Sequence, residues 1–166
     1  MLITLLLIER KLLPTPLLYL SAFFEATRNE YYRQLYEVSS NGSWQEWFIY
    51  FLDGVAIQGL DVLSRAERIN ALLISWEGKL TSRSDRIARD IIKLLTVTPF
   101  CTTKHISEKC GIAFTTAQRA INKLEKLRIL TQITQAQRDK VYCANDILTI
   151  LEEPTKTHED TNGSLR

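Results

Sequence analysis

The sequence is poor in the residues that enzymes most often use for acid–base or nucleophilic chemistry. Its 166 residues include only two histidines, His105 and His158, and neither lies in a recognisable catalytic motif. The three cysteines, Cys101, Cys110 and Cys143, lack the spacing of a metal site and leave one thiol over if two were to pair. We therefore predict no catalytic residue, no metal site and no cofactor. A reduced, cytoplasmic protein is expected, with Cys110 and Cys143 facing a core.

A long hydrophobic run is also missing. Residues 1–8, MLITLLLI, are apolar but are followed at once by Glu9, Arg10 and Lys11. The run is too short to cross a bilayer, and it lacks the basic start and the small-residue cleavage site of a signal peptide. A buried helix whose beginning has been lost explains it better, and we predict no membrane partner. Residues 152–166 are mostly polar, which predicts a disordered tail.

Positive charge is concentrated in one part of the chain. The whole sequence has a net charge of +2, but residues 81–150 carry 12 Lys or Arg and 6 Asp or Glu, a net charge of +6. Residues 1–80 and residues 151–166 each have a net charge of −2. A cationic segment favours a polyanionic partner, although such a charge is also compatible with a domain that is merely soluble.

The cationic segment contains a pattern of two short helices joined by a tight turn, at residues 102–130. Thr102 and Thr103 can cap the first helix, in which Ile106 and Cys110 point inward. Gly111 can end that helix in the left-handed conformation.

The second helix of the pair is expected to start at a Thr115 cap and to run to about Arg128. Its apolar residues recur every three or four positions and make one stripe. They are Ala117, Ala120, Ile121, Leu124 and Leu127. The opposite face is polar and basic. This layout is typical of a helix-turn-helix, whose second helix lies in the major groove of DNA.

The segments on both sides extend this pattern to a winged helix. Residues 85–98 have the periodicity of a helix, and their inward positions are Ile87, Ile91, Leu94 and Leu95. Residues 129–134 and 140–144 favour β-strands around a polar tip, which predicts a hairpin, or wing. We therefore predict a mainly α fold with a small β-hairpin. Three parts are expected: a helical segment (1–80), a winged helix-turn-helix domain (81–150) and the tail (151–166).

Nine polar or basic residues of this domain are candidates for contact with double-stranded DNA. They are Lys104, Thr115, Thr116, Gln118, Arg119, Asn122, Lys123, Arg138 and Lys140. Arginine makes a bidentate pair with guanine, and Gln and Asn make one with adenine, so Gln118, Arg119 and Asn122 are predicted to face bases. The two threonines suit phosphates or base edges, and the remaining basic residues suit phosphates. The competing interpretation is an ordinary solvated face, and for Lys126 and Arg128 we favour a simple interaction with the helix dipole.

The first 80 residues are predicted to be helical throughout, with no strand. After a proline-containing turn at residues 12–16, one helix is expected from residue 17 to about residue 38, with Phe23, Tyr31 and Leu35 among its apolar positions. A turn at residues 39–43 then leads to a long helix over residues 44–80. Gly54 and Gly59 inside it cost about 1 kcal/mol each relative to alanine, and they allow close helix packing or mark a bend.

Four motifs of this half occur in a distinctive order. They are LLPTPLLYLS at residues 12–21, the Tyr31-Tyr32 pair, Gly-x-Trp-x-x-Trp at residues 42–47, and Phe-Leu-x-Gly-Val at residues 51–55. In this order they resemble the segment that follows the active-site motif in Fic-family proteins. Many proteins of that family also end in a winged helix, so the resemblance spans roughly residues 2–150.

The resemblance implies a chemistry whose residues this sequence lacks. Fic-family proteins transfer a nucleotide, usually AMP from ATP, to a hydroxyl of a target protein through a His-Pro-Phe-x-Asp/Glu-Gly-Asn-Gly-Arg motif. That motif is absent, so no catalytic residue is assigned. One hypothesis is a DNA-binding module, expected to be a homodimer because one winged helix spans one half-site. Another is the non-catalytic half of an adenylyltransferase, binding ATP only when completed by a separate half. A third is a winged helix that serves protein contacts.

Overall fold

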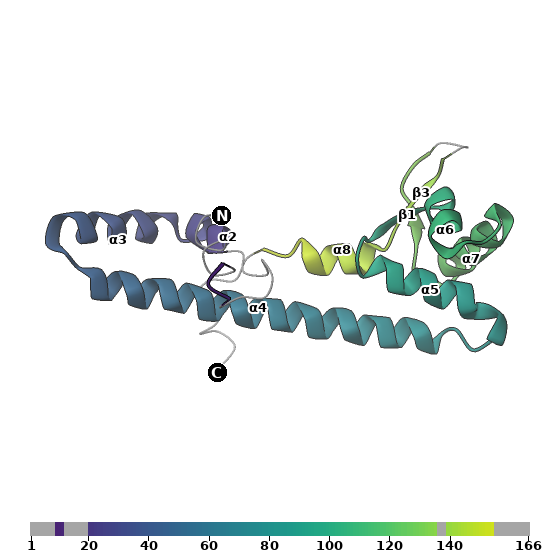
Figure 1. The fold of residues 1–166 in the computed structure, drawn as a ribbon, viewed down its shortest axis with the longest axis horizontal. Helices are drawn as coiled ribbons and strands as arrows, with labels where there is room; N and C mark the ends of the chain where they lie inside the picture. The colour runs from purple at the N-terminus through teal and green to yellow at the C-terminus, as the bar shows by residue number, and fades with distance from the viewer. Residues whose placement is uncertain (1–8, 12–19, 136–138, 155–166) are drawn as a thin grey trace. The chain divides into compact units, whose positions relative to one another are not determined.

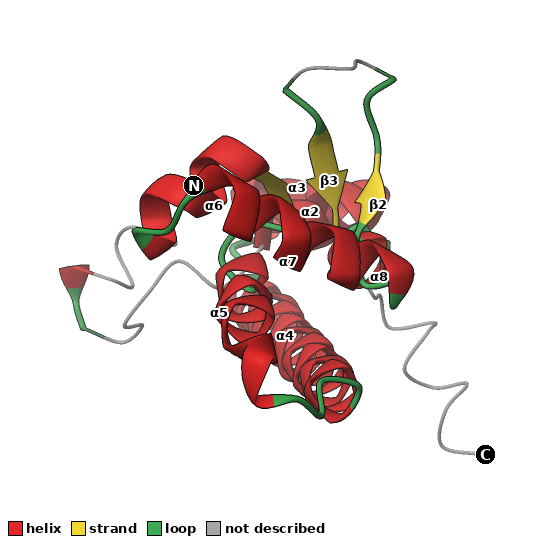
Figure 2. Ribbon diagram, turned by 90° about the vertical axis from the view of Figure 1, so that its right-hand side faces the viewer, coloured by secondary structure: helices red, strands yellow, loops and turns green. Residues whose placement is uncertain are grey.

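The computed structural model describes residues 9–11, 20–135 and 139–154, apart from the side chain of Arg83. Helices make up most of these residues, and a small three-stranded sheet accompanies them (Figure 1, Figure 2). The predicted mainly α fold with a small β component is thereby confirmed. The predictions for residues 1–8, for the turn at 12–16, for Arg138 and for the tail from residue 155 lie outside the described residues.

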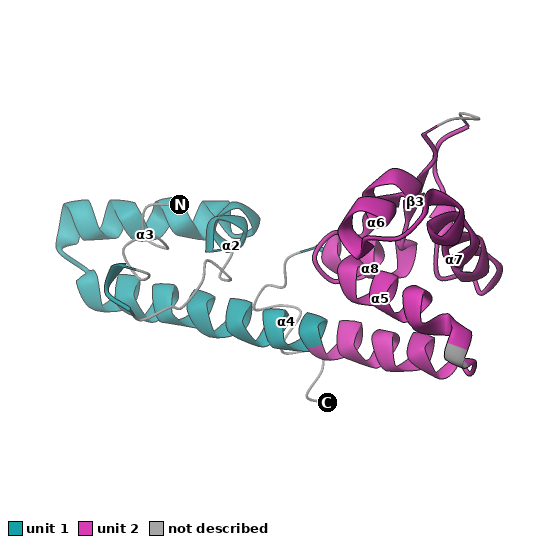
Figure 3. Cartoon of the chain, turned by 45° about the vertical axis from the view of Figure 1, so that its right-hand side comes forward, with its two compact units in different colours: residues 1–66, 154–166 teal, residues 67–153 magenta. Residues whose placement is uncertain are grey.

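The chain divides into two compact units, which are coloured separately in Figure 3. The first unit comprises residues 1–66 and 154–166, and the second comprises residues 67–153. The second unit begins inside helix α4 (Trp44–Gly78), so α4 contributes residues to both. The functional boundaries expected at residues 80 and 150 stay a prediction.

The first unit contains α2 (Leu20–Ala26), α3 (Arg28–Asn41) and the first part of α4. The single helix expected over residues 17–38 is wrong, because the chain leaves the helical conformation at Thr27, with φ −108° and ψ 34°. The Thr27 hydroxyl donates to the Phe23 carbonyl oxygen at 2.8 Å and lies 2.6 Å from the Tyr50 hydroxyl oxygen. A side-chain hydroxyl that bonds to the backbone nearby competes with helix hydrogen bonding.

Helix α3 also runs further than expected. Residues 39–41, which the sequence assigns to a turn, are still helical, and the helix ends at Gly42 in the left-handed conformation (φ 68°, ψ 24°). Leu35 is 37% exposed, so the prediction that it faces inward is wrong.

The core of the first unit is aromatic. Phe23, Tyr50 and Ile57 are buried, and Phe24, Tyr31 and Trp47 pack against them half-buried. At Gly54 a β-carbon would lie only 2.6 Å from two ring atoms of Phe23, so this glycine permits the close packing that the sequence suggested. At Gly59 nothing lies within 4 Å of such a carbon, so close packing does not explain that glycine.

Helix α4 is one unbroken helix of 35 residues, which confirms the long helix expected from residue 44. By length and composition alone it is able to cross a membrane, and 28% of its most apolar stretch is buried. The core helix of a globular protein can have the same length and composition. The absence of a membrane partner therefore stays a prediction.

The second unit contains a 3₁₀ turn, four complete helices, three short strands and the end of α4. These elements are η1 (Arg83–Asp85), α5 (Arg86–Leu95), β1 (Phe100–Thr102), α6 (Thr103–Cys110), α7 (Phe114–Lys126), β2 (Thr131–Gln132), β3 (Val141–Cys143) and α8 (Asn145–Leu151). Their buried side chains form one core with those at the end of α4, among them Trp76, Leu80, Ile91, Ile106, Ile121, Leu130 and Ile147. Trp76 and Leu80, which precede the predicted domain, are 1% and 2% exposed.

Helix α5 is shorter than the predicted helix at residues 85–98, and it ends at Leu95. The Thr96 hydroxyl there donates to the Lys93 carbonyl oxygen at 2.8 Å. Ile91 and Leu95 are buried as predicted, while Ile87 and Leu94 are half-buried against the same core. Ile92, which was not predicted to face inward, is also buried.

The three strands form an antiparallel sheet in the order β1-β3-β2. Figure 2 shows β3 and β2 side by side below the wing. The β2–β3 pair, with Thr131 opposite Cys143, confirms the predicted hairpin. Strand β1 was not predicted. It has three residues, and its partner β3 lies about 40 positions later, with Cys101 opposite Tyr142. Cys143 is buried and Cys110 half-buried, as expected, and burial raises the pKa of both thiols.

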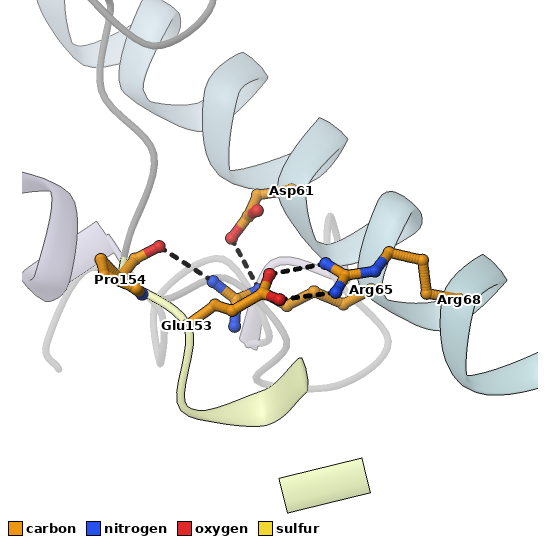
Figure 4. Close-up of polar contacts among 5 residues, drawn as sticks. All are labelled: Asp61, Arg65, Arg68, Glu153 and Pro154. Carbon is orange, nitrogen blue, oxygen red and sulfur yellow. Dashed lines mark hydrogen bonds and ion pairs between the residues drawn. The ribbon is translucent and has the colours of Figure 1, made fainter. Parts of the chain in front are cut away.

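Helix α8 was also not predicted. After it, a residue at the end of the second unit pairs with one near the beginning of that unit (Figure 4). The Glu153 carboxylate accepts two hydrogen bonds from the Arg68 guanidinium of α4, each 2.5 Å long. Within the first unit, Arg65 donates to the Asp61 carboxylate at 2.9 Å and to the Pro154 carbonyl oxygen at 3.2 Å. The second unit therefore begins and ends at neighbouring positions.

Candidate nucleic-acid interface

The turn between α6 and α7 is fixed by hydrogen bonds at both ends of α6. At its start, the Thr102 hydroxyl accepts a hydrogen bond from the His105 backbone N–H at 3.1 Å, which confirms the predicted cap. At its end, Gly111 adopts the left-handed conformation (φ 62°, ψ 37°), also as predicted. The Ser107 hydroxyl then donates to the Ile112 carbonyl oxygen at 2.6 Å. This turn sets the angle at which α7 leaves α6.

The cap of helix α7 lies two residues earlier than predicted. Ala113 occupies the cap position with no side-chain hydrogen bond, and Phe114 is the first helical residue. The prediction that Thr115 caps the helix is therefore wrong, and Thr115 and Thr116 instead lie in its first turn, both exposed. The helix ends at Lys126, two residues short of the expected end.

The two faces of α7 separate as the sequence indicates. Ala117, Ile121 and Leu124 are fully buried, and Ala120 and Leu127 are half-buried against the same core. The opposite face is open to solvent and displays Thr115, Thr116, Arg119, Asn122 and Lys126. In the part of the chain that the structure describes, Arg119 has no hydrogen-bond or ion-pair partner, so its guanidinium is available to a ligand.

Gln118 does not share this exposure. Its side chain is half-buried, and its amide oxygen accepts a hydrogen bond from the Thr103 hydroxyl at 2.8 Å. Its amide nitrogen donates to the Asn122 side-chain oxygen at 2.7 Å and to the Tyr142 hydroxyl oxygen at 3.3 Å. Thr103 and Tyr142 are only 5% and 1% exposed. Gln118 thus links α6, α7 and β3, a role that helical periodicity alone does not reveal.

Lys123 is likewise engaged within the protein. Its ammonium donates to the carboxylate of Asp85, whose side chain is 3% exposed. The same carboxylate accepts a hydrogen bond from the Ser82 backbone N–H at 3.1 Å, as part of a capping box around η1. The Lys123 hydrogen bond, helped by Ser82, lowers the pKa of Asp85 against the opposing effect of burial. Asp85 was not singled out from the sequence, although Ser-x-x-Asp before an apolar helix is a capping signal.

The start of α7 faces a hollow shared with α6 and the wing. The hollow has a volume of about 410 Å³ and is lined by Thr102, Thr103, Lys104, Phe114, Gln118, Asp139 and Lys140. Two predicted phosphate ligands, Lys104 and Lys140, therefore lie on one concave surface beside the exposed face of α7. Phe114 also lines this hollow and is 57% exposed. It was not among the candidate DNA contacts predicted from the sequence, although its place directly after the turn, at the start of the second helix, could have suggested one.

Arg138, predicted at the tip of the wing, falls in the gap at residues 136–138. His105 is exposed. Across the described ranges, no three His, Cys, Asp or Glu side chains gather in a way that would hold a metal ion.

Comparison with known proteins bears on the same region. Residues 84–131 match a family model described as winged helix-turn-helix DNA-binding. The matched residues run from within η1 to the start of β2, and so include α5, β1, α6 and α7. This part of the chain is a winged helix-turn-helix DNA-binding domain.

Proposed function

We propose that the winged helix-turn-helix domain makes this chain a sequence-specific binder of double-stranded DNA that acts in transcription regulation. The observation that carries the proposal is the solvent-exposed face of α7, where Arg119 and Asn122 project from a helix whose other face is locked into the core. In helix-turn-helix proteins the second helix enters the major groove and presents such side chains to base edges.

The residues around α7 divide into two roles. Arg119 suits the two acceptors of guanine, and Thr115 and Thr116, in the first turn, suit phosphate oxygens or base edges. Lys104 and Lys140 border the hollow and suit phosphates on one strand. We extend the phosphate role to Arg138 from its place in the sequence. Lys123 contributes through its pairing with Asp85, which holds α7 against η1.

A homodimer is part of the proposal. One winged helix covers one half-site, and two copies would read two half-sites related by symmetry. Sedimentation of the full chain, free and with a duplex that contains two half-sites, tests this. A single copy per duplex would refute the dimer without affecting the DNA-binding proposal.

The experiment that tests DNA binding is a titration of the full chain against a duplex at several salt concentrations. The logarithm of the binding constant should fall linearly with the logarithm of salt, by about 0.9 for each phosphate neutralised. Lys104→Ala should reduce that slope by about 1. Lys79→Ala removes the same charge from an exposed site outside the matched domain and should leave the slope unchanged. The proposal would be refuted if the chain showed no salt-dependent binding to duplex DNA, even at low salt.

A second candidate function rests on the motifs of residues 12–55, which resemble the segment that follows the Fic active site. The packing of Phe23 on Gly54 gives the Phe-Leu-x-Gly-Val motif a structural reason, because any larger residue would meet the ring. Under this proposal the first unit is the non-catalytic half of an adenylyltransferase. Mixing the chain with a separately expressed Fic catalytic segment, with labelled ATP and a target protein, should then restore AMP transfer. No transfer above that of the catalytic segment alone would remove this candidate.

A further inference from the structure

The hydrogen bonds of Gln118 bear on which base the neighbouring Asn122 reads. We propose that Gln118 is a positioning residue, which holds Asn122 with its amide nitrogen outward, so that Asn122 recognises a base-edge acceptor and prefers guanine to adenine. The inference rests on the proposed DNA binding by α7. It also revises the expectation, drawn from residue type alone, that Asn122 pairs with adenine.

The first step is the contact with Thr103. The Thr103 hydroxyl is buried and donates to the Gln118 amide oxygen at 2.8 Å. An amide oxygen only accepts hydrogen bonds, so this contact turns the oxygen of Gln118 toward α6 and its nitrogen toward α7 and β3.

The second step is the use of both amide protons of Gln118. One is directed to the Asn122 side-chain oxygen at 2.7 Å, and the other to the Tyr142 hydroxyl oxygen at 3.3 Å. Tyr142 is 1% exposed, and it belongs to β3, so the position of its hydroxyl is set by the sheet. Gln118 has no proton left to offer a base.

The third step concerns what Asn122 can offer. A bidentate pair with adenine needs the amide oxygen of asparagine to accept from N6 and its nitrogen to donate to N7. In this structure the oxygen of Asn122 already accepts from Gln118, while its nitrogen has no partner among the described residues. The exposed group is therefore a donor, and guanine presents two adjacent acceptors, N7 and O6, in the major groove.

The competing arrangement reverses every hydrogen bond. Thr103 would accept from Gln118, and Asn122 would donate to it and turn its oxygen to the groove. That arrangement would favour a base-edge donor, at adenine N6 or cytosine N4. The two arrangements thus predict different bases, and they also predict different amide protons exposed to water.

The first arm of the test needs no DNA. In the free full-length protein, NMR should show both side-chain amide protons of Gln118 protected from solvent exchange and those of Asn122 exchanging fast. In Thr103→Val the protection at Gln118 should fall, and in Thr103→Ser, which keeps the hydroxyl, it should persist. In the competing arrangement Gln118 donates only to Thr103 and Asn122 donates to Gln118. One protected side-chain amide proton at Asn122, together with one unprotected proton at Gln118, would therefore overturn the assigned direction in the wild-type protein.

The second arm is selection from a pool of duplexes randomised over the site. The base pair read by Asn122 is the one whose preference disappears in Asn122→Ala. We expect guanine there, and we expect Thr103→Val to weaken the preference by about threefold to tenfold, the effect of one hydrogen bond. Thr103→Ser should retain the preference, and Thr103→Val should add nothing in the Asn122→Ala background.

Adenine or cytosine at that position, or a preference unchanged by Thr103→Val, would overturn the proposal. If Thr103→Val does not fold, the wild-type base preference and the NMR exchange pattern still decide. If the wild-type protein binds no duplex at all, the proposed function fails and the base-reading role with it. In that case the NMR arm still shows separately whether the hydrogen-bond direction is right.

Discussion

At the scale of single residues, Arg119 and Lys140 are expected to act differently on DNA. Arg119 projects from the exposed face of α7, whereas Lys140 borders the hollow beside the wing. Arg119→Ala should weaken binding to the preferred duplex by about 1–3 kcal/mol and relax the preference at one base pair. Lys140→Ala should weaken all duplexes alike. Titration of each variant against preferred and scrambled duplexes checks this, and equal losses on both duplexes for Arg119→Ala would remove Arg119 from base recognition.

Asp85 gives the stability of the second unit a dependence on acidity. Its pKa is lowered in the folded state by Lys123 and Ser82, so its carboxylate stabilises the fold above the ordinary pKa of about 4. This contribution is lost as the pH falls through the lower folded-state pKa. Asp85→Asn should lower the free energy of unfolding near neutral pH and flatten its loss in acid. Chemical denaturation between about pH 2 and pH 7 measures both, and parallel profiles for the two proteins would contradict the role of Asp85.

At the scale of secondary-structure elements, helix α4 offers a matched pair of glycine substitutions. Gly54→Ala places a carbon 2.6 Å from the Phe23 ring in a fully buried core, and it should destabilise the protein by about 1–3 kcal/mol. Gly59→Ala meets nothing within 4 Å and should stabilise it by up to about 1 kcal/mol, because alanine is the better helix former. Thermal unfolding of the full chain decides. Similar shifts for both variants would show that the Phe23 contact is not restrictive.

Periodicity predicted the elements whose signals are local. The apolar stripe of α7 and the left-handed Gly111 follow from spacing and residue type, and both are present. The break at Thr27 escaped prediction because the Thr27 hydroxyl bonds both to the Phe23 carbonyl oxygen and to Tyr50, and Tyr50 lies 23 residues away in the sequence. Strand β1 escaped because three residues carry no alternation, and the partner that makes them a strand lies far along the chain.

The candidate interface was predictable in outline for the same reason. The exposed face of α7 follows from its periodicity, so the positions of Arg119 and Asn122 could be read from the sequence. The partners of Gln118 and Lys123 could not be read in this way. Thr103 precedes Gln118 by 15 residues and Asp85 precedes Lys123 by 38, so only the tertiary fold brings them together. Residue type alone does not indicate that both side chains donate hydrogen bonds within the protein, and their contacts with DNA stay a prediction.

At the scale of the whole molecule, the winged domain depends on residues before its expected start. Trp76 and Leu80 are buried in the core that also holds α5, α6 and α7. A fragment of residues 67–153 should therefore fold cooperatively and bind duplex DNA. A fragment of residues 81–153 should lose at least the amount typical of Trp→Ala in a core, about 3–5 kcal/mol.

Melting curves followed by circular dichroism compare the two fragments, with Trp76→Ala in the full chain as a control for the loss of that side chain alone. Equal melting temperatures for the two fragments would show that the end of α4 is dispensable. The functional boundary would then lie near residue 80, where the sequence suggests it.

The Arg68–Glu153 pair has a consequence for how such a chain can be rearranged. The first and last residues of the second unit lie next to each other. A domain with neighbouring ends can be inserted into a surface loop of another protein. Joining residue 66 to residue 154 by a short flexible linker would remove the second unit. Another DNA-binding domain with a different sequence preference could be inserted at the same two positions.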